Sequence, residues 1–191
     1  MTLYEIIISR RSIRQFKPQP VPRDLLEKMV NAARLAPSAA NRQPLEFVVV
    51  DDPGKTREIH PCLKWAASIA PQGNPKPGHE PTAFIVTLAN IQVRDKGFEW
   101  DAGAAVQNMI LVAWSEGVGS CWIVSVDKPR LREILGIPDS RIVDSVLALG
   151  YPDEQPAVED LVDSAAYWKD SEGRLHVPKR RLESIIHVNG F

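Results

Sequence analysis

The sequence is poor in cysteine and has no excess of either charge sign. Its two cysteines, Cys62 and Cys121, lie far apart, so they form neither a disulfide framework nor a CxxC metal site. We predict buried thiols in a reducing compartment. Lysine and arginine number 23 and aspartate and glutamate 24. This balance argues against nucleic-acid or anionic-membrane binding, because such proteins usually carry a positive excess.

Long apolar runs and familiar catalytic signatures are also absent. No run approaches the ~20 residues of a membrane span, and the N-terminus lacks the order of a signal peptide, so we predict a cytoplasmic protein. The motifs GxSxG, HExxH and GxxxxGK[ST] do not occur, and the histidines show no metal spacing. The segment GVGSCW at 117–122 follows a helix and enters a strand, which is the reverse of the dinucleotide-binding order.

The remaining pattern predicts one α+β domain covering residues 1–191, with a central mixed, mainly antiparallel sheet of about four strands flanked by helices. The predicted helices cover residues 2–9, 22–36, 53–67, 99–116 and 128–135, and the predicted strands cover 45–52, 82–90, 120–126 and 144–152. The run VVV in the first strand predicts that both of its faces are covered. Residues 71–81, PQGNPKPGHEP, predict a surface loop. The chain beyond about residue 156 shows little core-forming pattern.

The predicted helix at 99–116 is apolar on nearly every side. One face of a sheet cannot cover such a helix, so further burial is required. Its small-residue run from Ala102 to Ala105 would let another backbone approach closely. A symmetric partner is the commonest way to bury such a surface, so we predict a homodimer.

An arginine cluster is the first stretch that suggests a site. The sequence ISRRSIRQF at 8–16 places Arg10, Arg11 and Arg14 around Ser12. Planar guanidinium groups suit bidentate binding of phosphate. A solvated helix face is the alternative explanation for such a charge run.

Two further stretches carry polar groups. The loop APSAANRQPLEF at 36–47 brings Ser38, Asn41, Arg42 and Gln43 to the mouth of a strand, where ligand sites often form, although it could also be a plain connection. The tail VPKRRLESI at 177–185 contains Lys179, Arg180 and Arg181. Alone it is typical of a basic surface patch. Two separate basic clusters in a neutral protein favour a shared anionic ligand.

Four ordered stretches carry a family resemblance. RRSIRQF, AARLAPSAANRQPLEFVVV, DAGAAVQNMILVAWSEGVGSCWI and KRRLESII together resemble the nitroreductase family of FMN flavoproteins over nearly the whole chain. The resemblance implies that Arg10, Arg11 and Ser12 hold the phosphate and ribityl end of FMN. Arg14 would sit near the flavin N1/O2 edge, where a cation stabilises the reduced anion and tunes the potential.

The resemblance assigns the rest of the cofactor site to three segments. Pro37, Ser38, Ala39 and Asn41 would meet the flavin from the partner subunit. Val118, Gly119 and Ser120 would offer backbone groups to its other side. Lys179, Arg180 and Arg181 would complete the phosphate site; the family tail commonly has a basic pair followed by proline, where this chain has Arg181, so which two of the three contact phosphate stays open.

The implied activity is an FMN-dependent oxidoreductase. NADH or NADPH would donate hydride, and a nitroaromatic, quinone or similar small acceptor would then take the electrons by a ping-pong mechanism. The flavin carries the chemistry, so no catalytic side chain and no metal are expected. The resemblance also implies a homodimer with an exchanged C-terminal segment. The alternatives are a flavin-dependent dehalogenase, a flavin-cleaving relative, or a non-enzymatic flavin-binding or storage module.

Overall fold

The computed structural model describes residues 1–191. Its helices are α1 (Leu3–Ser9), α2 (Arg23–Arg34), α3 (Pro53–Ile59), α4 (Phe98–Ser115) and α5 (Lys128–Leu135). Its strands are β1 (Leu45–Val50), β2 (Ala83–Asn90), β3 (Gly119–Ile123), β4 (Arg141–Gly150), β5 (Ala157–Asp160), β6 (Trp168–Lys169) and β7 (Leu175–Lys179). No helix is both long and apolar enough to cross a membrane.

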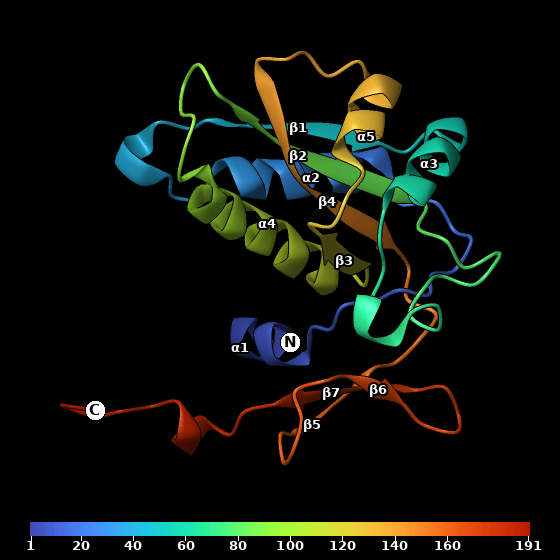
Figure 1. Cartoon of the computed structure of the whole chain (residues 1–191), viewed down its shortest axis with the longest axis vertical. Helices are drawn as coiled ribbons and strands as arrows, with labels where there is room; N and C mark the ends of the chain where they lie inside the picture. The colour runs from blue at the N-terminus through green and yellow to red at the C-terminus, as the bar shows by residue number, and fades with distance from the viewer.

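The central sheet has the strand order β1-β2-β4-β3. Every neighbouring pair is antiparallel, so the prediction of a four-stranded α+β fold is confirmed and the sheet is antiparallel throughout rather than mixed. Helices α2 and α4 pack on one face. Helices α3 and α5 and the segment after α1 pack on the other. Figure 1 shows α1 on the far side of α4 from the sheet, above the last strands.

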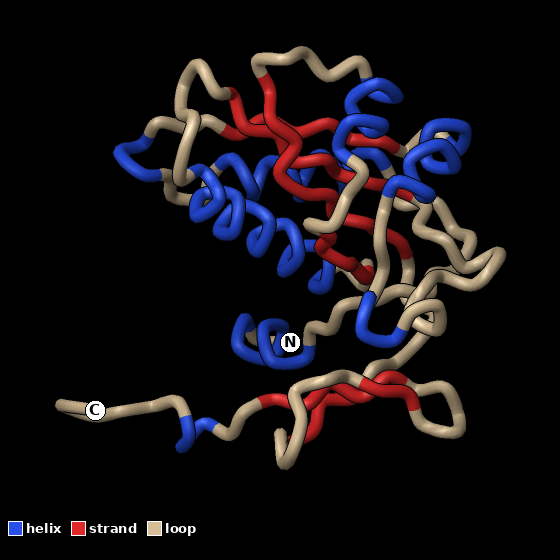
Figure 2. Tube along the Cα trace, in the orientation of Figure 1, coloured by secondary structure: helices blue, strands red, loops and turns tan.

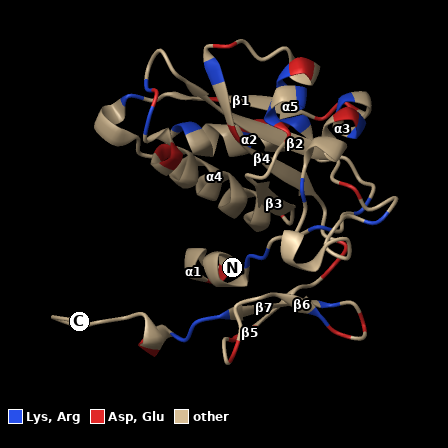
Figure 3. Ribbon diagram, in the orientation of Figure 1, with Lys and Arg blue, Asp and Glu red and all other residues tan.

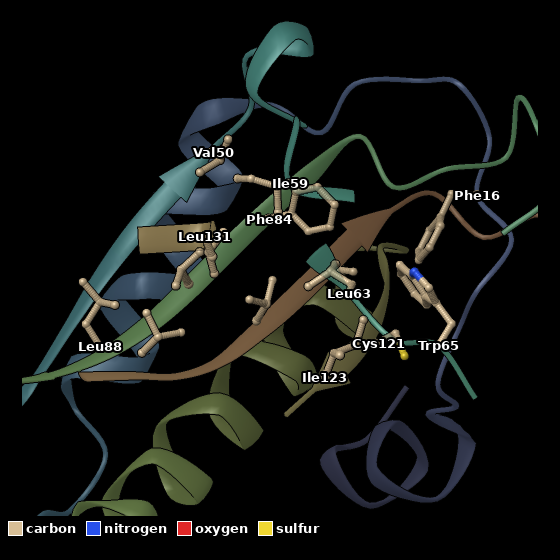
Figure 4. Packing of buried hydrophobic residues seen from close by; sticks show 14 of the residues in the cluster. Phe16, Val50, Ile59, Leu63, Trp65, Phe84, Leu88, Cys121, Ile123 and Leu131 are labelled. Atoms are coloured by element: carbon tan, nitrogen blue, oxygen red, sulfur yellow. The ribbon is translucent and has the colours of Figure 1, made fainter. Parts of the chain in front are cut away.

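Two apolar clusters fill the space on either side of the sheet. In β2, Phe84 and Val86 point into one cluster and Ile85 into the other, which is the period-two alternation of a strand covered on both faces. Figure 4 shows Phe16 and Trp65 at one end of the first cluster, with Cys121 next to them. The residues that follow the arginine cluster are therefore anchored in the core.

Local sequence signals explain where the helices begin and end. Thr2 and Glu5 form a capping box that starts α1, and Asp52 caps α3. The side chain of Asp127 caps α5, and Gly136 ends it in the left-handed conformation (φ 62°), which only glycine adopts without cost.

Strand β1 lies at the edge of the sheet, and Val48 and Val49 are only half-buried, whereas Val50 is buried. Val48 and Val50 nevertheless pack with one apolar cluster and Val49 packs against the other, so the prediction that both faces of this strand are covered is confirmed. Strand β2 is enclosed more fully, because all of its residues except the last are buried.

The C-terminal part contains a second sheet that the sequence pattern did not predict. Its order is β5-β7-β6, with β5 and β7 parallel and β6 and β7 antiparallel. Figure 2 shows these three strands separate from the central sheet, on the other side of α1. Beyond β7 the chain runs away from the body and exposes Leu182, Ile185 and Val188. The exchange of this segment with a partner stays a prediction.

Candidate cofactor site

The arginine cluster lies on an extended segment and not on a helix. Helix α1 ends at Ser9, and Ser12 then forms a parallel bridge with Ser120 of β3. The amide of Ile13 donates to the carbonyl of Ser120 at 2.9 Å, and the Ile13 side chain is fully buried. The alternative of a solvated helix face is therefore excluded, and β3 sets the position of the arginines.

The cluster holds positive charge that the chain does not neutralise. None of Arg10, Arg11 and Arg14 forms an ion pair within the chain. The Nε atoms of Arg11 and Arg14 are buried without a hydrogen-bond partner. Burial lowers the pKa of Arg10, and burial followed by repulsion from Arg10 lowers the pKa of Arg11. Such unpaired donors are costly unless a ligand satisfies them.

A cavity of about 250 Å³ joins this cluster to the C-terminal sheet. It is lined by Arg10, Arg11, Ser12, Arg14, Val158, Tyr167, Val177 and Lys179. Figure 3 shows the basic residues after α1 and those at the end of β7. The two basic clusters of the sequence thus meet in one chain through Lys179.

The other two tail cations have different partners. Arg180 donates to the carbonyl of Ser184, and Arg181 pairs with Asp160 at 3.1 Å. Neither residue lines the cavity. Of the three basic tail residues, Lys179 alone faces the arginine cluster.

The segment 118–120 forms the support behind the arginines. Val118, Gly119 and Ser120 are all buried, and the Ser120 carbonyl accepts from Ile13. Contact of their backbone groups with a ligand stays a prediction. A Cβ on Gly119 would lie 2.8 Å from Cγ1 of Ile13. Glycine is therefore what lets the arginine segment approach β3 so closely.

Both cysteines are buried. Cys121 lies in β3, and Cys62 lies in the segment that follows α3. Burial raises the pKa of the Cys121 thiol, and the positive charge of Arg14 opposes this shift only in part. Burial also raises the pKa of the Cys62 thiol. Both are free thiols in buried positions, as the sequence predicted.

The loop at 37–41 is held by one buried carboxylate. The Ala39 amide donates to Oδ1 of Asp101 at 3.0 Å, and Arg94 pairs with Oδ2 at 3.2 Å. Ala40 and Asn41 have positive φ angles of 53° and 52°, a region that non-glycine residues rarely adopt. Asp101 was not among the predicted site residues; its signal was a carboxylate in the first turn of an otherwise apolar helix, where Glu99 also lies.

The loop also contains an internal hydrogen bond and borders a second cavity. The Ser38 hydroxyl accepts from the Gln43 amide at 3.1 Å. Pro37 and Ser38 line a second cavity of about 160 Å³, together with Asp101.

One chain does not bring this loop and the arginine cluster together. The loop sits at the start of α4, where Asp101 holds it. The segment leading to the arginines sits at the end of α4, where Nε1 of Trp114 donates to the Ser9 hydroxyl. The 1.5 Å rise per helical residue separates these two points by about 20 Å. Figure 1 shows α1 beside the last turns of α4, away from the start of that helix.

Helix α4 is only partly covered within one chain. Trp100 is 81% exposed, and Gly103, Ala104 and Leu111 are half-buried. Counted from Trp100, these residues stand at positions i+3, i+4 and i+11, which places them on one side of the helix. Burial of this side by a partner stays a prediction.

A sequence model of the nitroreductase family matches residues 7–151. The chain belongs to the nitroreductase family. The resemblance carried by the four sequence stretches is thereby confirmed. The match includes the arginine cluster, the loop at 37–41 and β3, and it ends before the C-terminal sheet.

Individual members of the nitroreductase family resemble this chain over most of its length. A protein of Archaeoglobus fulgidus named "Putative NADH dehydrogenase/NAD(P)H nitroreductase" is 36% identical over 158 residues, which cover 79% of this chain and 86% of that protein. A crystal structure of a protein from Parabacteroides distasonis with the same name is 25% identical, with a TM-score of 0.75 and coverage of 100% and 99%. The FMN-dependent nitroreductase of Clostridium difficile R20291 is 28% identical, with a TM-score of 0.70 and coverage of 98% and 99%.

Proposed function

We propose that this chain binds FMN and uses NADH or NADPH to reduce small acceptors such as nitroaromatics or quinones. One observation carries the proposal: a set of arginines that form no ion pair, two of them with an unsatisfied Nε, lines one cavity with Lys179. A phosphate group would satisfy these donors. The names of similar family members, FMN-dependent nitroreductase and NAD(P)H nitroreductase, agree with this chemistry.

The cavity residues suit the phosphate and ribityl end of FMN. Arg10 and Arg11 offer guanidinium donors without carboxylate partners, and Ser12 offers a hydroxyl. Lys179 adds a third positive charge. We assign phosphate contact to Lys179 in preference to Arg180 and Arg181, because those two are bound to Ser184 and Asp160.

Arg14 suits the flavin edge that gains negative charge. FMN, when bound, takes hydride from the nicotinamide donor and passes electrons to the acceptor. The guanidinium of Arg14 would stabilise the extra charge at the N1/O2 edge and so raise the reduction potential. No acid or base side chain is required, which agrees with the absence of a catalytic constellation in the sequence. Donor and acceptor would use the same place in turn, which predicts ping-pong kinetics.

A homodimer would complete the site. The cavities of about 250 and 160 Å³ are each smaller than the ~300 Å³ at which ligand pockets begin. The segments that line them contact α4 at two points about 20 Å apart. A symmetric partner would bring its own loop at 37–41 to the arginine cluster of this chain. The exposed apolar side chains of α1, namely Leu3, Tyr4, Ile7 and Ile8, and the extended tail offer the surface for it.

A single experiment tests the central proposal. Purified protein is loaded with FMN, and the flavin absorbance is followed in the absence of oxygen. We expect rapid bleaching on addition of NADH or NADPH and recovery on addition of a quinone. Bound flavin that no nicotinamide reduces would instead indicate a storage module. Protein that takes up no FMN would refute the proposal. Loss of FMN on dilution to the monomer, followed by sedimentation, tests the shared site.

A further inference from the structure

Tyr167 is the one aromatic residue that lines the cavity of the arginine cluster. It belongs to the C-terminal segment, beyond the part of the chain that the family model matches. Its ring lies against the guanidinium of Arg14, with 5.5 Å between the guanidinium carbon and the ring centroid. This distance is within the ~6 Å at which a cation and an aromatic face attract each other.

The backbone of Arg14 is fixed, and its guanidinium lies against this ring. Glu154 accepts from the amide of Arg14, and the neighbouring Ile13 is buried in the core. The guanidinium itself has no ion pair within the chain, and its Nε has no hydrogen-bond partner. The Cys121 thiol also lies beside the Arg14 side chain. An arginine side chain without an ion pair has several orientations open to it, and the ring of Tyr167 restricts those of the guanidinium.

The position of Tyr167 is in turn fixed by its neighbour. Trp168 donates from Nε1 to Glu159 at 2.8 Å and stacks on His176 with 4.2 Å between ring centroids. This network holds the start of β6 against β7. The C-terminal sheet therefore holds the residue next to Tyr167 and brings the Tyr167 ring to Arg14.

We propose that Tyr167 is a positioning residue that holds the Arg14 guanidinium at the flavin edge and thereby sets the potential of bound FMN. This inference rests on the proposed function. The ring face is the active part, because the hydroxyl of Tyr167 makes no hydrogen bond within the chain. The C-terminal sheet, which the family match leaves out, thus becomes part of the redox site.

The test compares two substitutions at Tyr167 in the FMN-loaded protein. Tyr167→Phe keeps the ring face and removes the hydroxyl, whereas Tyr167→Leu removes the ring and keeps apolar volume. The midpoint potential of bound FMN is measured by redox titration against a reference dye, and FMN affinity is measured by fluorescence titration. We expect the Leu variant to have a lower potential with FMN affinity changed less than about threefold, and the Phe variant to match the wild type.

A double-mutant cycle with Arg14→Met shows whether the effect passes through Arg14. We expect Arg14→Met to lower the potential, and Tyr167→Leu to add nothing in that background. Equal potentials of the wild type and the Leu variant would overturn the inference. So would a Phe variant that behaves like Leu, an Arg14→Met variant with wild-type potential, or a Leu effect that persists without Arg14. If the wild-type protein binds FMN and NADH bleaches the bound flavin, the proposed function stands whichever of these results is found. Wild-type protein that binds no FMN refutes both.

Discussion

Substitution of Arg10 should change ligand binding and stability in opposite directions. Its guanidinium is partly desolvated, has no ion pair or side-chain hydrogen bond within the chain, and is repelled by Arg11. The substitution Arg10→Met keeps the aliphatic part of the side chain and removes the guanidinium charge. Loss of one charge-assisted contact to phosphate costs about 1.5–3 kcal/mol, which corresponds to roughly 10- to 150-fold weaker FMN binding. The apoprotein loses no favourable partner, so its free energy of unfolding should stay the same or rise.

The assay is fluorescence titration of apoprotein with FMN, paired with urea denaturation of the same apoprotein. Arg23→Met is the matched control, because Arg23 forms an exposed ion pair with Asp51. It should cost at most about 1 kcal/mol of stability and leave FMN affinity unchanged. An Arg10→Met protein with wild-type FMN affinity, or one whose apo form unfolds more easily by more than about 1 kcal/mol, would show that Arg10 has a structural role.

Four further outcomes are expected. Arg14→Ala should retain most FMN binding and lower the midpoint potential in a redox titration; an unchanged potential contradicts its assigned role. The pKa of His176 is raised by its two carboxylate partners, Asp170 first, so the stability that it adds to the C-terminal sheet is full below about pH 6.5 and is lost as pH rises through the raised pKa; hydrogen-exchange protection factors of this sheet, corrected for the intrinsic pH dependence of exchange, should fall there and should stay constant in His176→Gln. Asp101→Ala removes both the acceptor of the Ala39 amide and the ion-pair partner of Arg94 and should cost about 1–3 kcal/mol in urea denaturation, with Asp101→Asn costing less; equal losses would contradict this. Gly119→Ala should cost about 1–3 kcal/mol through contact with Ile13 and weaken FMN binding, and a fully stable variant would disprove the close approach.

Periodic apolar patterns predicted the central elements well. Helix α5 and strand β2 were found within one residue at each end of the predicted ranges, because their sequences combine a clear period with strong boundary residues. The edge position of β1 could not be predicted, since strand order depends on which segments pair across the whole chain. The run of valines gave no information on that pairing.

The C-terminal sheet was missed for a different reason. Its strands are short, and polar contacts hold them together: His176 is bound to Glu159 at 3.1 Å and to Asp170 at 2.9 Å. A pattern search based on apolar alternation does not detect such a sheet. The same limit applies to Asp101, whose role depends on a loop distant in sequence.

The composition of the anion site was predictable, but its geometry was not. Three arginines and a serine within five residues indicated a phosphate ligand. The extended conformation of the segment comes from its pairing with Ser120, a long-range contact that no local pattern encodes. The family resemblance assigned roles to the tail residues, whereas the structure distinguishes Lys179 from its two neighbours.

The burial of both thiols bears on what the proposed enzyme can tolerate. Quinones and partly reduced nitroaromatics are electrophiles that attack thiolates. Cys62 and Cys121 are enclosed, and burial raises the pKa of each, so both stay protonated near neutral pH and are poor nucleophiles. A chain that turns over such acceptors therefore presents no cysteine that its own substrate or product could arylate, and repeated turnover need not inactivate it.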